Sequence, residues 1–357
     1  MTAPSRARGA RAATPRIGFL GAGWIGRARM TALVRSGLAV AVAVADADPA
    51  ARAAAAADVP GIETMADLGQ LLAAGLDGIV IATPSALHAV QAVTALENGV
   101  AVFCQKPLAR DAAEAERVVE TARHHDLLLG VDLSYRHLRA TAAAKELIVA
   151  GRLGDIHTAE LVFHNAYGPD KPWFRSRRLA GGGCLIDLGT HLIDLALWLT
   201  GGQQVRVQAS RMLGGGRTLD GRRPGTGGSG TTRGDAVAGD EVEDVALAQC
   251  VIDERISARL ACSWNLHAGT DCVFECTLYG TDAAVSIRNV DGSFYDFAAY
   301  QHHGTASELL VAAPDEWGPR AICAWATALA RGAGFDAGAE RLVGLARTLD
   351  EIAEVAG

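Results

Sequence analysis

The sequence lacks the features that mark secreted, metal-binding and membrane proteins. Its seven cysteines are scattered, with no CxxC pair and no spacing typical of a zinc site. We therefore expect no metal and no disulfide framework, and we interpret the cysteines as reduced, mostly buried thiols of a cytoplasmic protein. No apolar run approaches the roughly 20 residues of a membrane span, so no membrane association is expected.

Positive charge is scarce as well. The formal net charge is -7, and no basic run follows the N-terminal region. This balance argues against a nucleic-acid partner, whose phosphates require a clustered positive face. The N-terminal stretch is rich in Arg, Ala and Pro and lacks the apolar centre of a secretory signal, so we predict a disordered tail over 1–15. A transit peptide is the alternative for this acid-free, Arg-rich start.

What is present is a regular alternation of apolar strands and helices up to residue 137. Strands are predicted at 16–20, 38–45, 77–82, 100–104 and 127–131, with helices at 24–36, 49–57, 86–98 and 112–125. Uninterrupted apolar strands separated by helices are typical of a doubly wound parallel sheet. With 357 residues the chain can hold two domains, and we assign 16–137 to an α/β Rossmann domain.

The pattern changes after residue 137. Strands are predicted at 156–165, 205–213, 242–252, 256–264, 272–279 and 284–287, with helices at 140–150, 184–199, 319–331 and 337–355. Consecutive strands with few helices between them indicate a large, mainly antiparallel open sheet, so 138–357 is predicted to be an α+β domain. The stretch 214–239 holds ten glycines and almost no apolar residue, and we predict a flexible loop there.

A GxGxxG sequence lies between the first strand and the first helix. Its glycines are Gly21, Gly23 and Gly26, and Trp24 and Ile25 stand between the last two. Glycines allow a tight turn and close approach to a pyrophosphate, and the helix N-terminus offers unbonded N–H groups. In this strand–turn–helix context the sequence predicts a dinucleotide site.

An acidic residue indicates which dinucleotide binds. Asp46 stands twenty residues after Gly26, at the end of the second strand. A carboxylate at this place accepts hydrogen bonds from the adenosine ribose and repels a 2′-phosphate, which favours NAD over NADP. Asp48 could share that role, and Arg52 keeps NADP possible.

Two further motifs stand where buried strands end. Thr83-Pro84 is followed by His88, and Gln105-Lys106 is followed by Pro107. Ligands of such sheets bind at the carboxyl ends of the strands, so we expect these residues at the cofactor. Lys106 could donate to a substrate oxygen or join a proton relay. A helix start at Pro84 and a solvated lysine are the structural alternatives.

A glycine run introduces a possible acid–base pair. Gly181 to Gly183 precede Asp187 and His191, which share one face of a helix because they are four residues apart. An imidazole beside a carboxylate suits proton abstraction from an alcohol. Upstream polar and aromatic side chains could contact a polyol or pack internally: His164, Asn165, Tyr167 and Trp173.

The ordered set of four motifs resembles the glucose–fructose oxidoreductase / inositol dehydrogenase (Gfo/Idh/MocA) family, from about Arg16 to the C-terminus. The resemblance implies that Lys106 is the catalytic lysine, that Asp187 binds the substrate hydroxyl and orients His191, and that His191 is the general base. Arg136 looks like the family's arginine, which contacts substrate or forms an interdomain salt bridge. The chain departs from the family at Gln105, where a glutamate is usual.

The resemblance implies an NAD-dependent dehydrogenase that oxidises a secondary hydroxyl of a sugar, sugar derivative, glycoside or cyclitol by hydride transfer. Two alternatives stay open: an enzyme that uses tightly bound NAD transiently for glycoside cleavage or epimerisation, and a non-catalytic dinucleotide-binding sensor. As in the family, we expect a homodimer or homotetramer formed through the sheet of the second domain.

Overall fold

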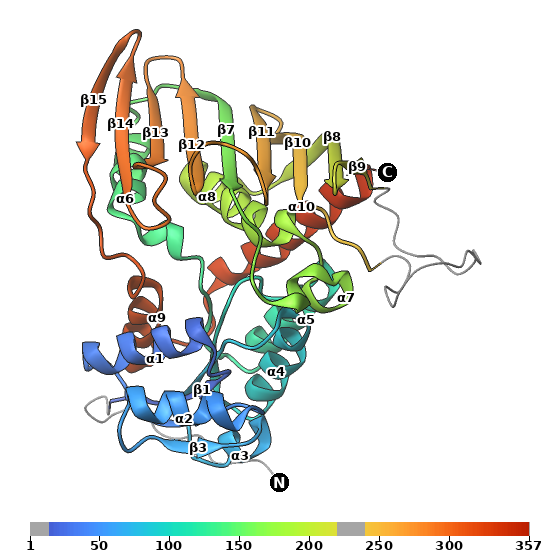
Figure 1. The fold of residues 1–357 in the computed structure, drawn as a ribbon. Coiled ribbons are helices and arrows are strands. Elements are labelled where there is room, and N and C mark those ends of the chain that lie inside the picture. The colour runs from blue at the N-terminus through green and yellow to red at the C-terminus, as the bar shows by residue number, and fades with distance from the viewer. Residues whose placement is uncertain (1–13, 220–239, 357) are drawn as a thin grey trace, which may run out of the picture.

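The computed structural model describes residues 14–219 and 240–356. Two β-sheets, one above the other, organise these residues (Figure 1). The predicted tail lies outside the described residues up to position 13, and so does the predicted loop from 220 to 239.

The first sheet is wholly parallel, as predicted. Its six strands run in the order β3-β2-β1-β4-β5-β6. They are β1 (Arg16–Leu20), β2 (Val40–Ala45), β3 (Glu63–Met65), β4 (Gly78–Ile81), β5 (Ala101–Cys104) and β6 (Leu129–Val131). The helices between them are α1 (Trp24–Ser36), α2 (Pro49–Asp58), α3 (Leu68–Leu72), α4 (Ser85–Glu97) and α5 (Ala112–His124). The sequence did not indicate β3 and α3, which are too short to display a period. The strand order reverses between β1 and β4, where such sheets bind ligands.

The second sheet is mixed and mainly antiparallel. Its nine strands run in the order β15-β14-β13-β12-β7-β11-β10-β8-β9, and only β7 and β11 pair in parallel. They are β7 (Ile156–Asn165), β8 (Val205–Gly214), β9 (Arg217–Thr218), β10 (Val245–Ile252), β11 (Ile256–Ser263), β12 (Cys272–Gly280), β13 (Ala284–Asn289), β14 (Phe297–His303) and β15 (Ala306–Val311). Strands β14 and β15 were missed from the sequence.

One face of the second sheet is covered by helices. These are α6 (Arg139–Val149), α8 (Thr190–Thr200) and α10 (Arg341–Val355) (Figure 1). The short elements η1 (Ser134–His137), η2 (Pro172–Arg175), α7 (Arg177–Ala180), the π-helical turn η3 (Leu185–Gly189) and η4 (Ala337–Glu340) complete the chain.

The predicted flexible loop begins later than expected. Strand β8 continues to Gly214 and pairs with β9, with Leu213 opposite Thr218. Gly215 and Gly216 form the turn between them with φ values of 55° and 76°. The prediction of a loop was therefore wrong for 214–218, because two of its glycines make a hairpin turn rather than a linker.

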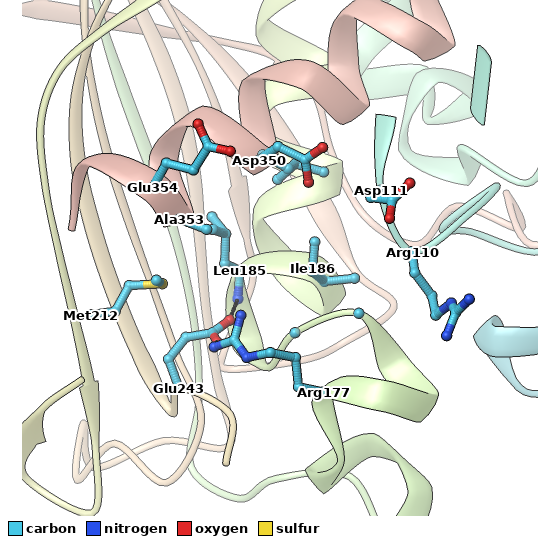
Figure 2. A pocket seen from close by; sticks show the side chains of 13 residues that line it. Arg110, Asp111, Arg177, Leu185, Ile186, Met212, Glu243, Asp350, Ala353 and Glu354 are labelled. Atoms are coloured by element: carbon cyan, nitrogen blue, oxygen red, sulfur yellow. Dashed lines mark hydrogen bonds and ion pairs between the residues drawn. The ribbon is translucent and has the colours of Figure 1, made fainter. Parts of the chain in front are cut away.

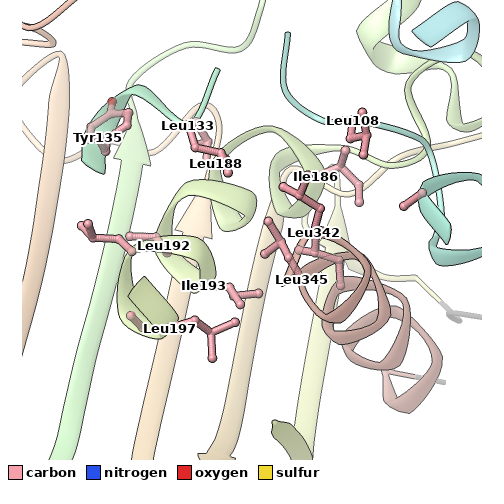
Figure 3. Close-up of a cluster of buried hydrophobic side chains, with 14 of the residues drawn as sticks. Leu108, Leu133, Tyr135, Ile186, Leu188, Leu192, Ile193, Leu197, Leu342 and Leu345 are labelled. Carbon is pink, nitrogen blue, oxygen red and sulfur yellow. The ribbon is translucent and has the colours of Figure 1, made fainter. Parts of the chain in front are cut away.

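A single hydrophobic cluster joins the two sheets. Leu108, Leu133 and Tyr135, which follow strands of the parallel sheet, are in the same buried cluster as residues of η3, α8 and α10 (Figure 3). Leu192, on α8, is fully buried there. This shared core holds the carboxyl ends of the parallel strands beside the turn that precedes α8.

The segment Arg177–Thr200 is apolar and long enough to cross a membrane by length and composition, which the sequence analysis had not recognised. It comprises α7, η3 and α8, and 83% of its most apolar window is buried inside the fold. Its apolar character is that of a core helix packed on both sides.

Helix α9 (Arg320–Ala330) follows the second sheet in the chain but packs on the parallel sheet beside α1 (Figure 1). Two glycines make room for its Trp325. A Cβ atom at Gly78 would lie 2.6 Å from the Trp325 ring, and one at Gly130 would lie 2.7 Å from it. The ring contacts Phe103 with centroids 5.6 Å apart. The chain end is thereby fastened to the first sheet.

We expect Trp325→Ala to lower the free energy of unfolding by about 3–5 kcal/mol, because it empties a site that the two glycines shape for an indole. Chemical denaturation of the purified protein measures this. Trp24→Ala is the matched control, since that ring is 72% exposed and its loss leaves no cavity. A Trp325→Ala loss below about 1 kcal/mol would contradict the packing described.

Candidate active site

A cleft of about 1590 Å³ lies between the two sheets. The parallel sheet contributes residues that follow β1, β2, β4, β5 and β6, all at its carboxyl edge. The second half of the chain contributes the end of β7, the turn η3, and the segments that precede β14 and α9. The predicted cofactor, acid–base and substrate motifs therefore meet in one place, although they are up to 170 residues apart in the chain.

The three glycines of the first motif have different structural reasons. Gly21 has φ 95°, a left-handed conformation that favours glycine. A Cβ at Gly26 would overlap the carbonyl oxygen of Gly21, so this glycine lets α1 pack closely on the turn. A Cβ at Gly23 would meet nothing within 4 Å, and Gly23 lines the cleft with Trp24 and Ile25's neighbouring N–H groups. The turn thus leaves open space at the N-terminus of α1, where an anion is favoured.

Asp46 stands at the end of β2 and lines the same cleft. Its carboxylate accepts hydrogen bonds from the backbone N–H groups of Ala22 (2.7 Å) and Asp48 (2.9 Å), which hold it beside the glycine turn. Arg52 donates to the carbonyl oxygens of Asp46 (2.5 Å) and Ala47 (3.3 Å), so part of its guanidinium is already engaged. Asp48 caps α2 by accepting from Ala50 N–H.

Thr83, Pro84 and His88 line the cleft, but the histidine ring is bound by backbone. Its Nδ1 lies 2.7 Å from the carbonyl oxygen of Pro107, and its Nε2 lies 2.7 Å from that of Thr83. His88 is 1% exposed, and burial lowers its pKa. The ring braces the ends of β4 and β5 against each other, which gives it a structural reason beside the predicted cofactor contact.

Lys106 and Asp187 form the central contact of the cleft. Lys106 Nζ lies 2.6 Å from Asp187 Oδ1 and 2.8 Å from the backbone oxygen of the same residue. The second carboxylate oxygen accepts from Trp264 Nε1 at 3.1 Å. One carboxylate thus ties the end of β5, the turn η3 and the residue after β11 together.

His191 lies near this ion pair, in the first turn of α8. The π-helical turn η3 precedes α8, so Asp187 and His191 are not on one regular α-helix as predicted, though both face the cleft. Asp187 is bound by Lys106 and Trp264, and the implied orientation of His191 by Asp187 is not what holds the ring. Instead the ring packs on Tyr135, with centroids 4.7 Å apart.

The electrostatic state of His191 suits a base. Burial, together with the positive charge of Lys106, holds the pKa of His191 well below its usual value of 6.5. The imidazole is therefore neutral at neutral pH. Its Nδ1 is buried and has no hydrogen-bond partner in the described part of the chain.

The predicted substrate contacts are divided by strand alternation. Asn165 and Trp173 line the cleft with Tyr167, and Asn165 Oδ1 is buried without a partner among residues 14–219 and 240–356. His164 is the neighbour of Asn165 on β7, so it points to the other face, where its Nδ1 lies 2.8 Å from Ser263 Oγ. His164 is absent from the cleft lining, and its assignment as a substrate contact is corrected by this geometry.

Arg136 is placed in an ion pair rather than in the cleft. Its Nε lies 2.8 Å from Asp194 Oδ2, and a second contact joins its other nitrogen to Oδ1. The pair links η1 to α8 and does not line the cleft. Of the two predicted roles for Arg136, the structure therefore favours the salt bridge.

A second, smaller pocket of about 220 Å³ lies on the far side of the glycine run, and it shares Gly182 and Ile186 with the cleft. Figure 2 shows Glu243 and Arg177 at one side of it. Glu243 accepts from the N–H groups of Gly183 (2.8 Å) and Leu185 (3.0 Å), so it shapes the turn that presents Asp187.

The comparison with known proteins agrees with these motifs. The model of the oxidoreductase family with an NAD-binding Rossmann fold matches residues 15–133, and the GFO/IDH/MocA C-terminal domain model matches residues 141–286. A protein of Amycolatopsis mediterranei, named as the proposed oxidoreductase subunit of a UDP-kanosamine synthase, is 31% identical over 286 residues. That alignment covers 78% of this chain and 73% of the relative.

The chain belongs to the Gfo/Idh/MocA family. It is an oxidoreductase, as its relatives are named. Solved structures share the fold: levoglucosan dehydrogenase in complex with NADH has a TM-score of 0.79 at 21% identity, covering 96% of each chain. A 3-ketoreductase from Actinomadura kijaniata in complex with NADP and TDP-benzene has a TM-score of 0.77 at 19% identity, covering 95% of this chain and 96% of that one.

The departure of this Gfo/Idh/MocA member at Gln105 has a local cause. Gln105 Nε2 donates to Asp132 Oδ2 at 2.5 Å, and Arg29 Nε donates to the same oxygen at 2.6 Å. Ser134 Oγ donates to the other oxygen, Oδ1, at 2.5 Å. Asp132 is 1% exposed. A glutamate at 105 would bring two buried carboxylates within hydrogen-bond distance, which disfavours charge on both.

The same contact fixes the orientation of the Gln105 amide. Because its nitrogen faces Asp132, its oxygen is the atom left to accept hydrogen bonds, as a glutamate oxygen would. The sequence missed Asp132 and Arg29, which have no motif around them. It also missed Trp264 and Tyr135, since no local pattern marks a tryptophan after a strand or a tyrosine beside Arg136 as part of a site.

We expect the pKa of His191 to rise in Lys106→Met, because the variant removes a nearby positive charge and leaves Asp187 without its partner. It should stay below 6.5, since burial is the larger cause and is unchanged. Titration of the imidazole by NMR measures both points. Lys171→Met is the matched control, because Lys171 lines the same cleft but its side chain is 65% exposed and pairs with Asp170. An unchanged or lower value in Lys106→Met would refute the assigned cause.

We expect Gln105→Glu to be less stable than the native chain at pH 8 and to recover as the pH falls. The folded state would raise the pKa of one of the two facing carboxyls, so its stability is kept at low pH and lost as pH rises. Adding Asp132→Asn should restore stability at pH 8, with a coupling of about 1–3 kcal/mol between the two changes. Urea unfolding of both single variants and the double variant gives that coupling. Equal stability of Gln105→Glu and the native chain at both pH values would contradict it.

Proposed function

We propose that the chain oxidises a secondary hydroxyl of a sugar, sugar derivative, glycoside or cyclitol with NAD. One observation carries the proposal: a neutral imidazole, His191, lies in the same cleft as the lysine–carboxylate pair and the glycine turn. A neutral base is able to accept the proton that an alcohol loses on oxidation.

The cleft fits a dinucleotide. The open space at Gly23 and the N-terminus of α1 suit a pyrophosphate, and Asp46 suits the adenosine ribose. Asp46 and the partial engagement of Arg52 by backbone support NAD over NADP. Thr83, Pro84, Gln105 and Lys106 would hold the other half of the cofactor. When bound, NAD supplies the hydride acceptor of the reaction.

The chain's own residues then handle the substrate. The reacting hydroxyl would lie between His191 and Lys106, with its proton passing to the imidazole. Lys106 keeps its ammonium beside Asp187 and can donate to the developing carbonyl oxygen. Asn165 Oδ1 and the face of Trp173 would orient the rest of the molecule. Intact Lys106, Asp187 and His191 in one cleft argue against a purely sensory protein.

A screen of sugars, glycosides and cyclitols for NADH formation tests the proposal, with NAD and NADP run in parallel. We expect turnover with NAD, and a loss of about 100-fold or more in kcat for His191→Asn and for Lys106→Met, with NADH binding kept in both. His157→Asn, at an exposed histidine of β7, is the matched control and should keep full turnover. Full activity of the double variant Lys106→Ala/His191→Ala would overturn the mechanism. Product formed without added NAD and without net NADH would instead establish transient use of bound cofactor.

We also propose a homodimer or homotetramer formed through the uncovered face of the second sheet. That face exposes apolar side chains, among them Leu247 (41%) and Tyr279 (38%). Light scattering that gives the mass of a single chain would refute this.

A further inference from the structure

Aromatic side chains gather in the cleft far beyond their share of the chain. The sequence holds only six Trp, five Tyr and eight Phe. Eight of these line the cleft: Trp24, Tyr135, Tyr167, Trp173, Phe174, Phe294, Tyr295 and Trp317. Trp24 belongs to the glycine turn, and the other seven belong to the half of the cleft where the substrate would lie.

A subset of them extends outward from the proposed base. Tyr135 packs on His191 and also on Trp317, with ring centroids 5.2 Å apart. Trp317 Nε1 donates to the backbone oxygen of Tyr295 at 2.8 Å. We call Tyr135, Trp317 and Tyr295 the aromatic wall. It begins at His191 and ends at a tyrosine that is 61% exposed, although large apolar rings are usually buried.

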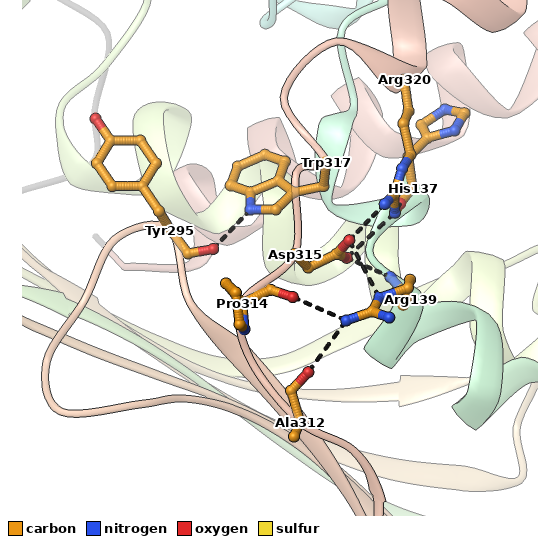
Figure 4. A network of polar contacts seen from close by, with 8 residues as sticks. All are labelled: His137, Arg139, Tyr295, Ala312, Pro314, Asp315, Trp317 and Arg320. Carbon is orange, nitrogen blue, oxygen red and sulfur yellow. Dashed lines mark hydrogen bonds and ion pairs between the residues drawn. The ribbon is translucent and has the colours of Figure 1, made fainter.

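The wall is held by a polar network, shown in Figure 4. Asp315 accepts from the backbone N–H of Arg139 (2.7 Å) and from Arg320 NH1 (3.1 Å). Arg320 also donates to the carbonyl oxygen of His137 (2.8 Å), and Arg139 donates to that of Pro314 (2.8 Å). The segment that carries Trp317 is thus fastened on both sides. A fixed ring binds a flat ligand without the cost of ordering it first.

The charges of the cleft say what this ligand is not. Each lining cation near the substrate half already has a carboxylate: Arg29 has Asp132, Lys106 has Asp187, and Lys171 has Asp170. Glu316 adds a further acidic side chain beside Trp317. A diphosphate would need unengaged Arg or Lys groups there, so the nucleotide sugars in the names of two relatives do not suit this half of the cleft.

We infer that the substrate is a glycoside whose aglycone is an uncharged aromatic group, held on the aromatic wall while its sugar faces His191. This inference rests on the proposed function and narrows its substrate class. Stacking of two aromatic rings adds about 0.5–1.5 kcal/mol beyond the area that is buried. A methyl aglycone, or a free sugar, leaves Trp317 and Tyr295 without a partner.

Matched glycosides test it. For several hexoses, kcat/KM with NAD is compared for the phenyl glycoside and the methyl glycoside, with UDP-glucose and cellobiose as further substrates. We expect the phenyl-to-methyl ratio to be about tenfold or higher. It should fall by about tenfold in Trp317→Ala, and Tyr295→Ala should reduce it too. The Tyr295 ring is largely exposed, so its loss does not disturb the fold. Tyr279→Ala, at an exposed tyrosine of β12 outside the cleft, is the matched control and should leave the ratio unchanged.

A ratio near one for every hexose would overturn the inference, and so would a higher kcat/KM for UDP-glucose or cellobiose than for the phenyl glycosides. Failure of the proposed function is seen separately, because then no sugar, glycoside or cyclitol reduces NAD. In that case calorimetric titration of the NADH-loaded protein with phenyl and methyl glucoside still decides, since the wall predicts tighter binding of the phenyl compound. Equal binding of the two would reject it.

Discussion

The contact between Lys106 and Asp187 is the interaction on which the site depends. It joins the end of a parallel strand to a π-helical turn 81 residues later, and the same carboxylate accepts from Trp264. The ammonium group lowers the pKa of His191 beside it, and the carboxylate keeps that ammonium in place. Neither sheet contains a complete site alone, because the lysine comes from one and the carboxylate and imidazole from the other.

The environment of Gln105 shows how a charge can move between neighbouring strands without being lost. The carboxylate that the family usually has after β5 is replaced by an amide here, and a buried carboxylate, Asp132, follows β6 instead. Arg29 and Ser134 complete its hydrogen bonds. A buried carboxylate is tolerated only when it is fully bonded, so the two positions and Arg29 must be considered together. A substitution at one of them has its meaning only in the context of the others.

The two halves of the cleft use different chemistry. On the side of the parallel sheet, backbone geometry dominates: glycines open a turn, and a helix N-terminus and Asp46 face the opening. On the other side, rigid rings dominate, and they are held by the network around Asp315. The first half suits a charged ligand that many proteins share, while the second suits a flat, uncharged one. This division supports a cofactor on one side and a substrate on the other.

The sequence by itself determined the parallel sheet, the mainly antiparallel second sheet, the glycine turn and the candidates Lys106, Asp187 and His191, because period, strand-end position and spacing are local properties. It could not find β14 and β15, the place of α9 on the first sheet, or the hairpin at 214–218. Nor could it separate Asn165 from His164, since the face to which each points follows from the register of β7 with its neighbours. The ion pair of Arg136, the partner of Gln105 and the wall of Tyr135, Trp317 and Tyr295 were decided only by tertiary structure, because each joins residues that are distant in the chain and adjacent only after the two sheets share one core.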